Sequence, residues 1–343
     1  MRNNLFNYAT SELSQDAFIC YLASFAFDEV TTDSVLKECA KNLLHLFVSE
    51  IQPETVCLLD IERQVNHIDV LITAEDQGTT YKIIVEDKTF TSEHDDQLIR
   101  YRDSLSAEAD AAGYDVRGVF YKTGFQCDLS TVEKAGYVIV SREVMLQFLQ
   151  PYAEQSSNQI IAEYYAYWKT FQDNADAYRE KPLSQWSWLQ VNGFYDGVKA
   201  SSFANQHGFW LGYGYVANRA GGFYGLWTGS YSDRVEVGKK RYELYLQMET
   251  TTGDPTTSLI CLKLSCPDGC SADEIRAARN SIAYDGNAYR PARYRFKRPN
   301  RLVLGKHMSI GVFDYSYNDS ASALTALEQA SEEYCKLIDA LTT

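Results

Sequence analysis

Two acidic residues and a lysine stand at strand-like spacing in the first third of the chain. The segment HIDVLI (67–72) is followed, after a turn, by YKIIVEDKT (81–89). Alternate side chains of a strand share one face of the sheet. We therefore expect Glu86 and Lys88 to point the same way and Asp87 to point to the opposite face.

Asp69 provides a second carboxylate at the same place. It lies on the opposite face of its strand from Ile68, Val70 and Ile72, which are predicted to be buried. Antiparallel pairing of the two strands would bring Asp69 beside Glu86. Mg²⁺ binds one or two carboxylates together with water and phosphate oxygens, and a nearby lysine can orient or deprotonate the attacking water. The alternative is an ion pair on the surface of the sheet, which contributes little to stability.

The helix expected after these strands adds an amide and a phenol. Gln97 and Tyr101 are four residues apart, so they share one helical face. The early turns of this helix can overhang the end of the sheet that carries Glu86 and Lys88. The two side chains could there hydrogen-bond a phosphate or a base edge. An ordinary amphipathic helix face explains the same spacing.

An Asp in one strand, E-x-K in the next and Q-x-x-x-Y in the following helix resemble the PD-(D/E)XK nuclease superfamily. The order HIDVLI, VEDKT, QLIRY is particularly similar to its RecB-like branch. The opening segment SELSQDAF, with Glu12 in the first helix, resembles a bacterial subgroup in which an early glutamate joins the active site. The resemblance covers residues 1–150, less than half of the chain. RecB-like exonucleases often have an upstream histidine ligand, and this chain has Glu12 instead.

The resemblance implies a metal-dependent nuclease that hydrolyses phosphodiester bonds, with DNA as its nucleic-acid partner, in repair or in defence against foreign DNA. It implies Mg²⁺ or Mn²⁺ as cofactor, held by Glu12, Asp69, Glu86 and the main-chain carbonyl of Asp87. Lys88 would position the nucleophilic water. Gln97 and Tyr101 would contact the nucleic acid or support the metal ligands. The alternative is a catalytically inactive nuclease fold that binds nucleic acid or protein and needs neither metal nor Lys88.

The order of predicted elements favours two domains. Residues 1–180 alternate helices and strands, and the resemblance implies an α/β fold with a mixed sheet flanked by helices. A linker at Glu180–Pro182 leads into 183–343, predicted to be an α+β domain for recognition of substrate or partner. Residues 186–231 are dense in Trp, Tyr, Phe and Gly, which indicates an antiparallel meander. A protein partner or a second copy of the chain could bind through this domain.

Charge is divided unevenly along the chain. The net charge is −14, and residues 1–150 carry 12 Lys and Arg against 25 Asp and Glu. An acidic surface repels nucleic acid, so such a substrate requires a local basic surface or divalent cations. The longest mostly apolar run, 17–27, is too short for a membrane span, so no membrane partner is expected. Eight dispersed cysteines are typical of reduced thiols and predict a cytoplasmic protein.

A basic segment in the second half provides such a surface. Residues 276–306 hold nine Lys and Arg and one acid, Asp285, with aromatic residues interleaved. In RYRFKR (293–298), strand alternation would place Arg293, Arg295 and Lys297 on one face, where they could bind nucleic acid. The alternative is a half-buried strand whose basic face packs on the acidic first domain.

Overall fold

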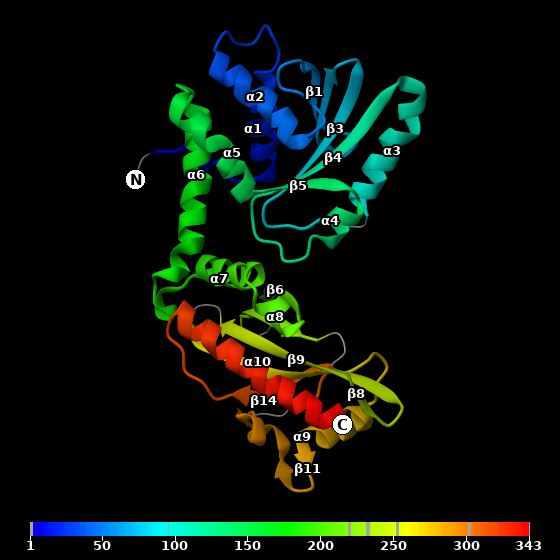
Figure 1. The fold of residues 1–343 in the computed structure, drawn as a ribbon, viewed down its shortest axis with the longest axis vertical. Helices are drawn as coiled ribbons and strands as arrows, with labels where there is room; N and C mark the ends of the chain where they lie inside the picture. The colour runs from blue at the N-terminus through cyan, green and yellow to red at the C-terminus, as the bar shows by residue number, and fades with distance from the viewer. Residues whose placement is uncertain are drawn as a thin grey trace. The chain divides into compact units, whose positions relative to one another are not determined.

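The chain folds into two compact units of mixed α and β structure, Met1–Gln172 (unit 1) and Asp173–Thr343 (unit 2), each built around its own sheet (Figure 1). The division falls inside a helix, several residues before the linker predicted at Glu180–Pro182. This computed structural model describes the following residues: 3–94, 96–218, 221–230, 234–251, 254–300 and 303–342.

Unit 1 contains a five-stranded mixed sheet in which strand order follows chain order. The strands are β1 (Cys57–Val65), β2 (Ile68–Asp76), β3 (Thr79–Lys88), β4 (Tyr114–Lys122) and β5 (Tyr137–Ser141). The first three pair antiparallel, and β3, β4 and β5 pair parallel. Gln77 and Gly78 both have positive φ, at 49° and 83°, as the tight turn between β2 and β3 requires. This turn fixes the register in which Val70 pairs with Val85.

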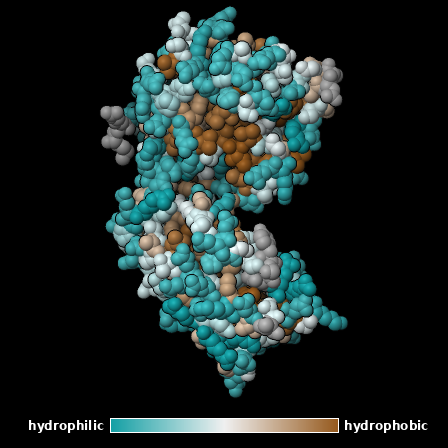
Figure 2. Space-filling view, in the orientation of Figure 1, coloured by the Kyte–Doolittle hydropathy of each residue, from teal (hydrophilic) through white to brown (hydrophobic). Residues whose placement is uncertain are grey.

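Helices cover both faces of this sheet. The helices are α1 (Glu12–Ser24), α2 (Ser34–Phe47), α3 (Gln97–Ala112), α4 (Ser130–Lys134), α5 (Arg142–Gln155) and α6 (Gln159–Asp176), with a short 3₁₀ turn, η1, at Leu5–Asn7. Residues of α1, α2, α5 and α6 pack on the face that carries Ile83 and Val85. Residues of α3 and α4 pack on the face that carries Ile84. In the view of Figure 2, hydrophobic side chains of unit 1 gather between α2 and β5.

Unit 2 contains a larger antiparallel sheet. Its strands are β6 (Trp210–Val216), β7 (Phe223–Gly229), β8 (Arg234–Val237), β9 (Lys240–Thr251), β10 (Asp254–Ser265), β13 (Phe296–Lys297) and β14 (His307–Phe313). The order is β13-β14-β10-β9-β7-β6, and β8 pairs with β9. The small hairpin of β11 (Tyr284–Asp285) and β12 (Ala288–Tyr289) forms a separate pair. The prediction of an α+β arrangement for this part of the chain agrees with these strands and the helices beside them.

Four helices and three 3₁₀ turns accompany this sheet. The helices are α7 (Trp188–Ala200), α8 (Phe203–His207), α9 (Ala272–Ala283) and α10 (Ser320–Thr342), and the 3₁₀ turns are η2 (Ala177–Arg179), η3 (Leu183–Gln185) and η4 (Arg290–Tyr294). The counts refer to the described residues. The Tyr334 hydroxyl of α10 donates to the Leu244 carbonyl of β9 at 2.7 Å, which ties the helix to the sheet.

The prediction of an antiparallel meander over 186–231 was wrong in its first half. Residues 188–200 form α7, and only β6 and β7 of that segment are strands. The helix begins with a capping box between Ser187 and Gln190, which satisfies two of the free amides at its start. Val191, Phe194 and Val198 then recur at helical spacing and are buried. The aromatic residues of this segment therefore serve a helix–sheet core.

The prediction that Arg293, Arg295 and Lys297 alternate along one strand was also wrong. Residues 290–294 form the 3₁₀ turn η4, with Pro291 near its start, and Arg295 has a left-handed backbone with φ of 63°. Only Phe296 and Lys297 belong to a strand, β13. A proline fixes φ near −65° and removes an amide donor, so it favours the first position of a turn over a continuing strand.

Among the described residues, no helix combines the length and the apolar character needed to cross a membrane.

The close approach of α7 to the end of α6 generates a prediction about stability. A Cβ placed on Gly193 would lie 2.3 Å from the Ala175 carbonyl oxygen. We expect Gly193→Ala to destabilise unit 2 by about 1–3 kcal/mol, because the helices must move apart. The midpoint of urea unfolding, followed by Trp fluorescence, measures this change, since four of the five tryptophans lie in unit 2.

Gly305→Ala is the matched control, because its Cβ would meet nothing closer than the His307 carbonyl oxygen at 3.9 Å. Equal midpoints for the two variants would contradict the close packing of α7 against α6.

Candidate active site

The carboxyl end of β3 positions three charged side chains. Glu86 and Lys88 continue the face of Ile84, toward α3, and Asp87 continues the face of Ile83 and Val85, toward α1. The exposed fractions of Glu86, Asp87 and Lys88 are 2%, 1% and 9%. Three ionisable groups in succession are thus buried. Burying charge is costly unless the charge is paired.

Lys88 lies at the centre of this group. Its Nζ donates to Glu86 Oε1 at 2.5 Å and to the main-chain carbonyl oxygen of Asp87 at 3.0 Å. The same Nζ lies 3.5 Å from Asp69 Oδ2. Asp69 stands opposite Glu86 in the continued β2–β3 register. The structure thus brings together Asp69, Glu86 and Lys88, as the sequence analysis expected.

The first turn of α3 overhangs this sheet end. Gln97, its first residue, donates from Nε2 to Glu86 Oε1. Tyr101 lies one turn further and packs against the core on the α3 side of the sheet. Burial, assisted by the negative charges of Glu86 and Asp69, raises the pKa of Tyr101. Gln97 therefore supports a carboxylate directly, and Tyr101 lies in the field of the same carboxylates.

Helix α1 contributes two carboxylates, and they have different surroundings. Glu12 Oε1 accepts hydrogen bonds from the Thr89 amide at 3.0 Å and from the Thr91 hydroxyl at 2.7 Å. Glu12 thus holds the segment that follows β3. One helical turn later, Asp16 is 1% exposed and has a carboxylate oxygen in a cluster with those of Asp69 and Asp87, all within 4.8 Å of one another.

Asp16 was missed in the sequence analysis, although the spacing offered a signal. Glu12 and Asp16 are four positions apart, so both lie on one face of α1. Gln64 joins the site as well, because its Nε2 donates to Asp16 Oδ2 at 2.9 Å and to Asp69 Oδ1 at 3.1 Å. Gln64 has a positive φ of 56°. No feature of the sequence around this residue indicates that contact.

Several carboxylate oxygens in the cluster lack a hydrogen-bond donor. Among the described residues, no N–H or O–H group serves Asp16 Oδ1, Glu86 Oε2 or either side-chain oxygen of Asp87. Burial, together with the charge of Asp69, raises the pKa of Glu86 to about 7. Burial and the adjacent Asp16 also raise the pKa of Asp87. Buried polar atoms are normally satisfied, so these oxygens call for a proton or a cation beside them.

The donor set fits a hard divalent cation. Carboxylates from α1, β2 and β3 converge, and Mg²⁺ and Mn²⁺ prefer oxygen ligands of this kind. A cation there would remove the cost of burying like charges together. The main-chain carbonyl of Asp87, a ligand according to the resemblance, accepts a hydrogen bond from Lys88, and the side chain of Asp87 belongs to the cluster.

A second lysine borders the site. Lys122 ends β4 and is paired with Lys88 in the parallel register of β3 and β4. Its Nζ donates to the Thr91 carbonyl at 2.5 Å. Burial lowers the pKa of Lys122 to about 8, against the opposite effect of Glu12 and Glu93. Sequence analysis did not single out Lys122, because parallel pairing of β3 with β4 is a tertiary feature.

The three basic residues predicted to bind nucleic acid belong to unit 2, and each has a local partner. Arg293 lies 3.4 Å from Asp285, and Lys297 lies 2.7 Å from Asp314. Arg295 stacks over the Phe313 ring at 5.1 Å. The charges of these three residues therefore already interact with neighbouring groups of unit 2.

The raised pKa of Glu86 generates a prediction about pH. The unfolded chain ionises this carboxyl near 4.5, whereas the folded protein keeps its proton until about 7. Ionisation of Glu86 therefore lowers the free energy of unfolding as pH rises through this window, by up to about 3 kcal/mol. We expect Glu86→Gln to remove this loss. Urea unfolding of the metal-free protein at pH 4.5 and 7.5, with and without the substitution, measures it. Parallel pH dependence in both proteins would contradict it.

Comparisons of this chain with protein-family models, with curated proteins and with solved structures returned no match.

Proposed function

We propose that this protein is a metal-dependent nuclease that hydrolyses phosphodiester bonds in DNA through a PD-(D/E)XK-type site in unit 1. The observation that carries the proposal is the cluster of Asp16, Asp69 and Asp87. Glu86 and Lys88 lie beside Asp69, and several of the buried carboxylate oxygens lack donors among the described residues. The mixed sheet with helices on both faces has the architecture that the sequence resemblance implies, which supports the proposal further.

The carboxylates divide into two roles in this proposal. Asp16, Asp69, Glu86 and Asp87 would hold Mg²⁺ or Mn²⁺. A bound cation of this kind neutralises charge on a phosphodiester and acidifies a water molecule. Glu12 would position the chain after β3, because both of its hydrogen bonds go to Thr89 and Thr91. Asp16 thus takes the ligand role that the resemblance implied for Glu12.

Lys88 would act as a cation in the reaction. Burial alone would lower its pKa, but the carboxylates of Glu86 and Asp69 beside it raise the pKa above the usual value. Lys88 therefore stays protonated at neutral pH. Its ammonium group can donate to the attacking water or to a phosphate oxygen, and it stabilises the negative charge that develops there.

The residues of α3 would support this arrangement. Gln97 fixes the Glu86 carboxylate by a direct hydrogen bond. Tyr101 is partly exposed on the same helix face, and its phenol can donate to a phosphate oxygen. Neither residue needs to change its protonation state.

The proposal predicts cleavage that depends on metal and on Lys88. The purified protein should cleave DNA with Mg²⁺ or Mn²⁺ and lose this activity with a chelator. Lys88→Ala should reduce the rate by at least about 100-fold, the loss expected when a charge that stabilises the transition state is removed. Gel assays on linear, circular and single-stranded DNA, and on RNA, measure the activity and its substrate.

Lys37→Ala is the matched control, because Lys37 is a lysine of unit 1 that pairs with the exposed Asp28 at 3.4 Å. This variant should cleave like the unsubstituted protein. Equal activity of the Lys88 and Lys37 variants would contradict the proposed role. Absence of cleavage with both metals on all four substrates would favour the inactive binding module.

Metal binding itself distinguishes the two carboxylates of α1. Asp16→Asn should weaken Mn²⁺ binding about 10-fold to 100-fold or more, because it removes a charged ligand. Glu12→Gln should weaken it less, since Glu12 contacts backbone and hydroxyl donors. Titration calorimetry with Mn²⁺, without nucleic acid, measures both. Strong loss in Glu12→Gln with unchanged binding in Asp16→Asn would reverse these assignments.

A further inference from the structure

Several cations of the basic segment 276–306 pair with carboxylates of unit 2. Four of them lie close to a carboxylate: Arg276 to Asp273 at 2.7 Å, Arg293 to Asp285 at 3.4 Å, Lys297 to Asp314 at 2.7 Å and Lys306 to Asp268 at 2.6 Å. Arg295 donates to Gln329 at 3.1 Å and stacks over Phe313. Neutralised cations gain little from an added anion, so an anion site is expected among the others.

Three arginines of the segment have no carboxylate within ion-pair distance among the described residues: Arg279, Arg290 and Arg298. Arg279 donates to the side-chain oxygen of its neighbour Asn280, at 2.8 and 3.1 Å. Arg290 donates to the Tyr284 main-chain carbonyl at 3.3 Å. A guanidinium whose charge has no carboxylate partner keeps its attraction for a phosphate.

Two of these arginines line one surface hollow of about 780 Å³, together with Asn280, Tyr284 and Gly286. We call this the α9 hollow. Arg279 comes from the end of α9, Gly286 from the turn of the β11–β12 hairpin, and Arg298 from the residue after β13. A Cβ on Gly286 would meet nothing within 4 Å. The space on the side-chain side of Gly286 is therefore open.

The chemistry of the lining matches a phosphodiester strand. Guanidinium groups bind phosphate oxygens in a two-pronged geometry. An amide side chain and an exposed turn amide can add neutral hydrogen bonds. The half-buried Tyr284 ring packs edge-on against Tyr289 at 5.7 Å, and an aromatic ring beside phosphate-binding arginines is a common feature of single-strand binding surfaces.

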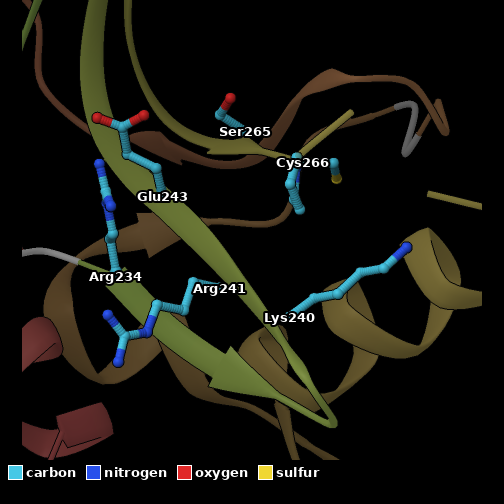
Figure 3. Close-up of a pocket in the computed structure, with 7 residues that line it drawn as sticks. Arg234, Lys240, Arg241, Glu243, Ser265 and Cys266 are labelled. Carbon is cyan, nitrogen blue, oxygen red and sulfur yellow. The ribbon is translucent and has the colours of Figure 1, made fainter. Parts of the chain in front are cut away.

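A second hollow in unit 2 shows why charge alone does not select a site. Arg234, Lys240, Arg241 and Glu243 line it, with Ser265 and Cys266 (Figure 3). Lys240 lies 3.0 Å from Glu274, and Arg241 lies 2.7 Å from Glu236. Arg234 stands opposite Glu243 in the β8–β9 register, and Figure 3 shows their charged groups pointing the same way. Two of the three cations there thus pair with acids, and the Glu243 carboxylate is part of the lining, which disfavours an anion.

We propose that the α9 hollow binds the phosphate backbone of a nucleic acid strand through Arg279 and Arg298, with Tyr284 beside it. The choice of nucleic acid among phosphate-bearing ligands rests on the proposed function of unit 1. The site gives this acidic chain a local basic surface for an anionic polymer. It also replaces the predicted set of Arg293, Arg295 and Lys297, whose charges are engaged elsewhere.

The test is binding of fluorescein-labelled single-stranded DNA, measured by fluorescence anisotropy with the full chain and a chelator, so that no cleavage intervenes. The double variant Arg279→Ala/Arg298→Ala should raise Kd roughly 10-fold or more and flatten the dependence of log Kd on log salt by about one to two. Inorganic phosphate at the same phosphate concentration should not displace the DNA.

The matched control is Arg276→Ala/Lys297→Ala, which removes the same charge from two ion-paired residues, one of them on the same helix α9. It should keep Kd within about twofold, since exposed ion pairs contribute little. The proposal would be overturned if both double variants weakened DNA binding equally, or if neither weakened it. Displacement by inorganic phosphate at that concentration would show a site for a single phosphate group and overturn it as well.

Different measurements test the α9 hollow and the nuclease proposal. With metal present, Arg279→Ala/Arg298→Ala should raise KM and leave kcat unchanged, whereas Lys88→Ala should lower kcat. A protein that binds DNA through the α9 hollow but never cleaves it would support this site and contradict the nuclease. If the protein cleaves DNA and Arg279→Ala/Arg298→Ala has the same KM as the unsubstituted protein, the α9 hollow is not a binding site. The nuclease proposal would then still stand.

Discussion

Carboxylates from three chain segments are buried together at the carboxyl end of β3, with fewer donors than oxygens around them. Asp16, Asp69, Glu86 and Asp87 meet there, and Lys88 supplies the one ammonium group within salt-bridge distance of them among the described residues. Like charges in a protein interior raise one another's pKa and destabilise the fold unless a cation or protons neutralise them. Burial of this cluster without a neutralising partner lowers the free energy of unfolding. Either a bound cation or retained protons must therefore neutralise this cluster.

Other elements of unit 1 position the side chains at this end of the sheet. The tight turn at Gln77 and Gly78 sets the β2–β3 register, which puts Asp69 opposite Glu86. Helix α1 brings Asp16 to one face, and α3 brings Gln97 to the other. Unit 2 offers a different chemistry, since Arg279 and Arg298, which have no carboxylate within ion-pair distance among the described residues, line an exposed hollow. An acidic centre and a basic hollow in one chain are compatible with the proposed metal-dependent enzyme acting on a polyanion.

Sequence patterns predicted the parts of this arrangement that depend on local periodicity. Alternation in β3 separates Asp87 from Glu86 and Lys88, and a short turn with glycine fixes its partner strand. The resemblance pointed to Glu12 and Asp16 was missed, because helical phase gives a face but not which turn reaches the sheet. The many aromatic residues around Trp188 led to a prediction of strands. Ser187 and Gln190 have the spacing of a capping box, which indicates the start of a helix. Strand alternation failed at Arg295, where Pro291 had already begun a 3₁₀ turn.

The most direct test of the central claim is a crystal structure of the protein with Mn²⁺, using the anomalous signal of the metal to locate it. We expect a manganese peak among the carboxylates of Asp16, Asp69, Glu86 and Asp87, with the Asp16 and Asp87 oxygens that now lack donors turned toward it. Ordered carboxylates at that position without a manganese peak, at a concentration that saturates other carboxylate sites, would contradict it. In that case protons would neutralise the cluster, and its role would be structural.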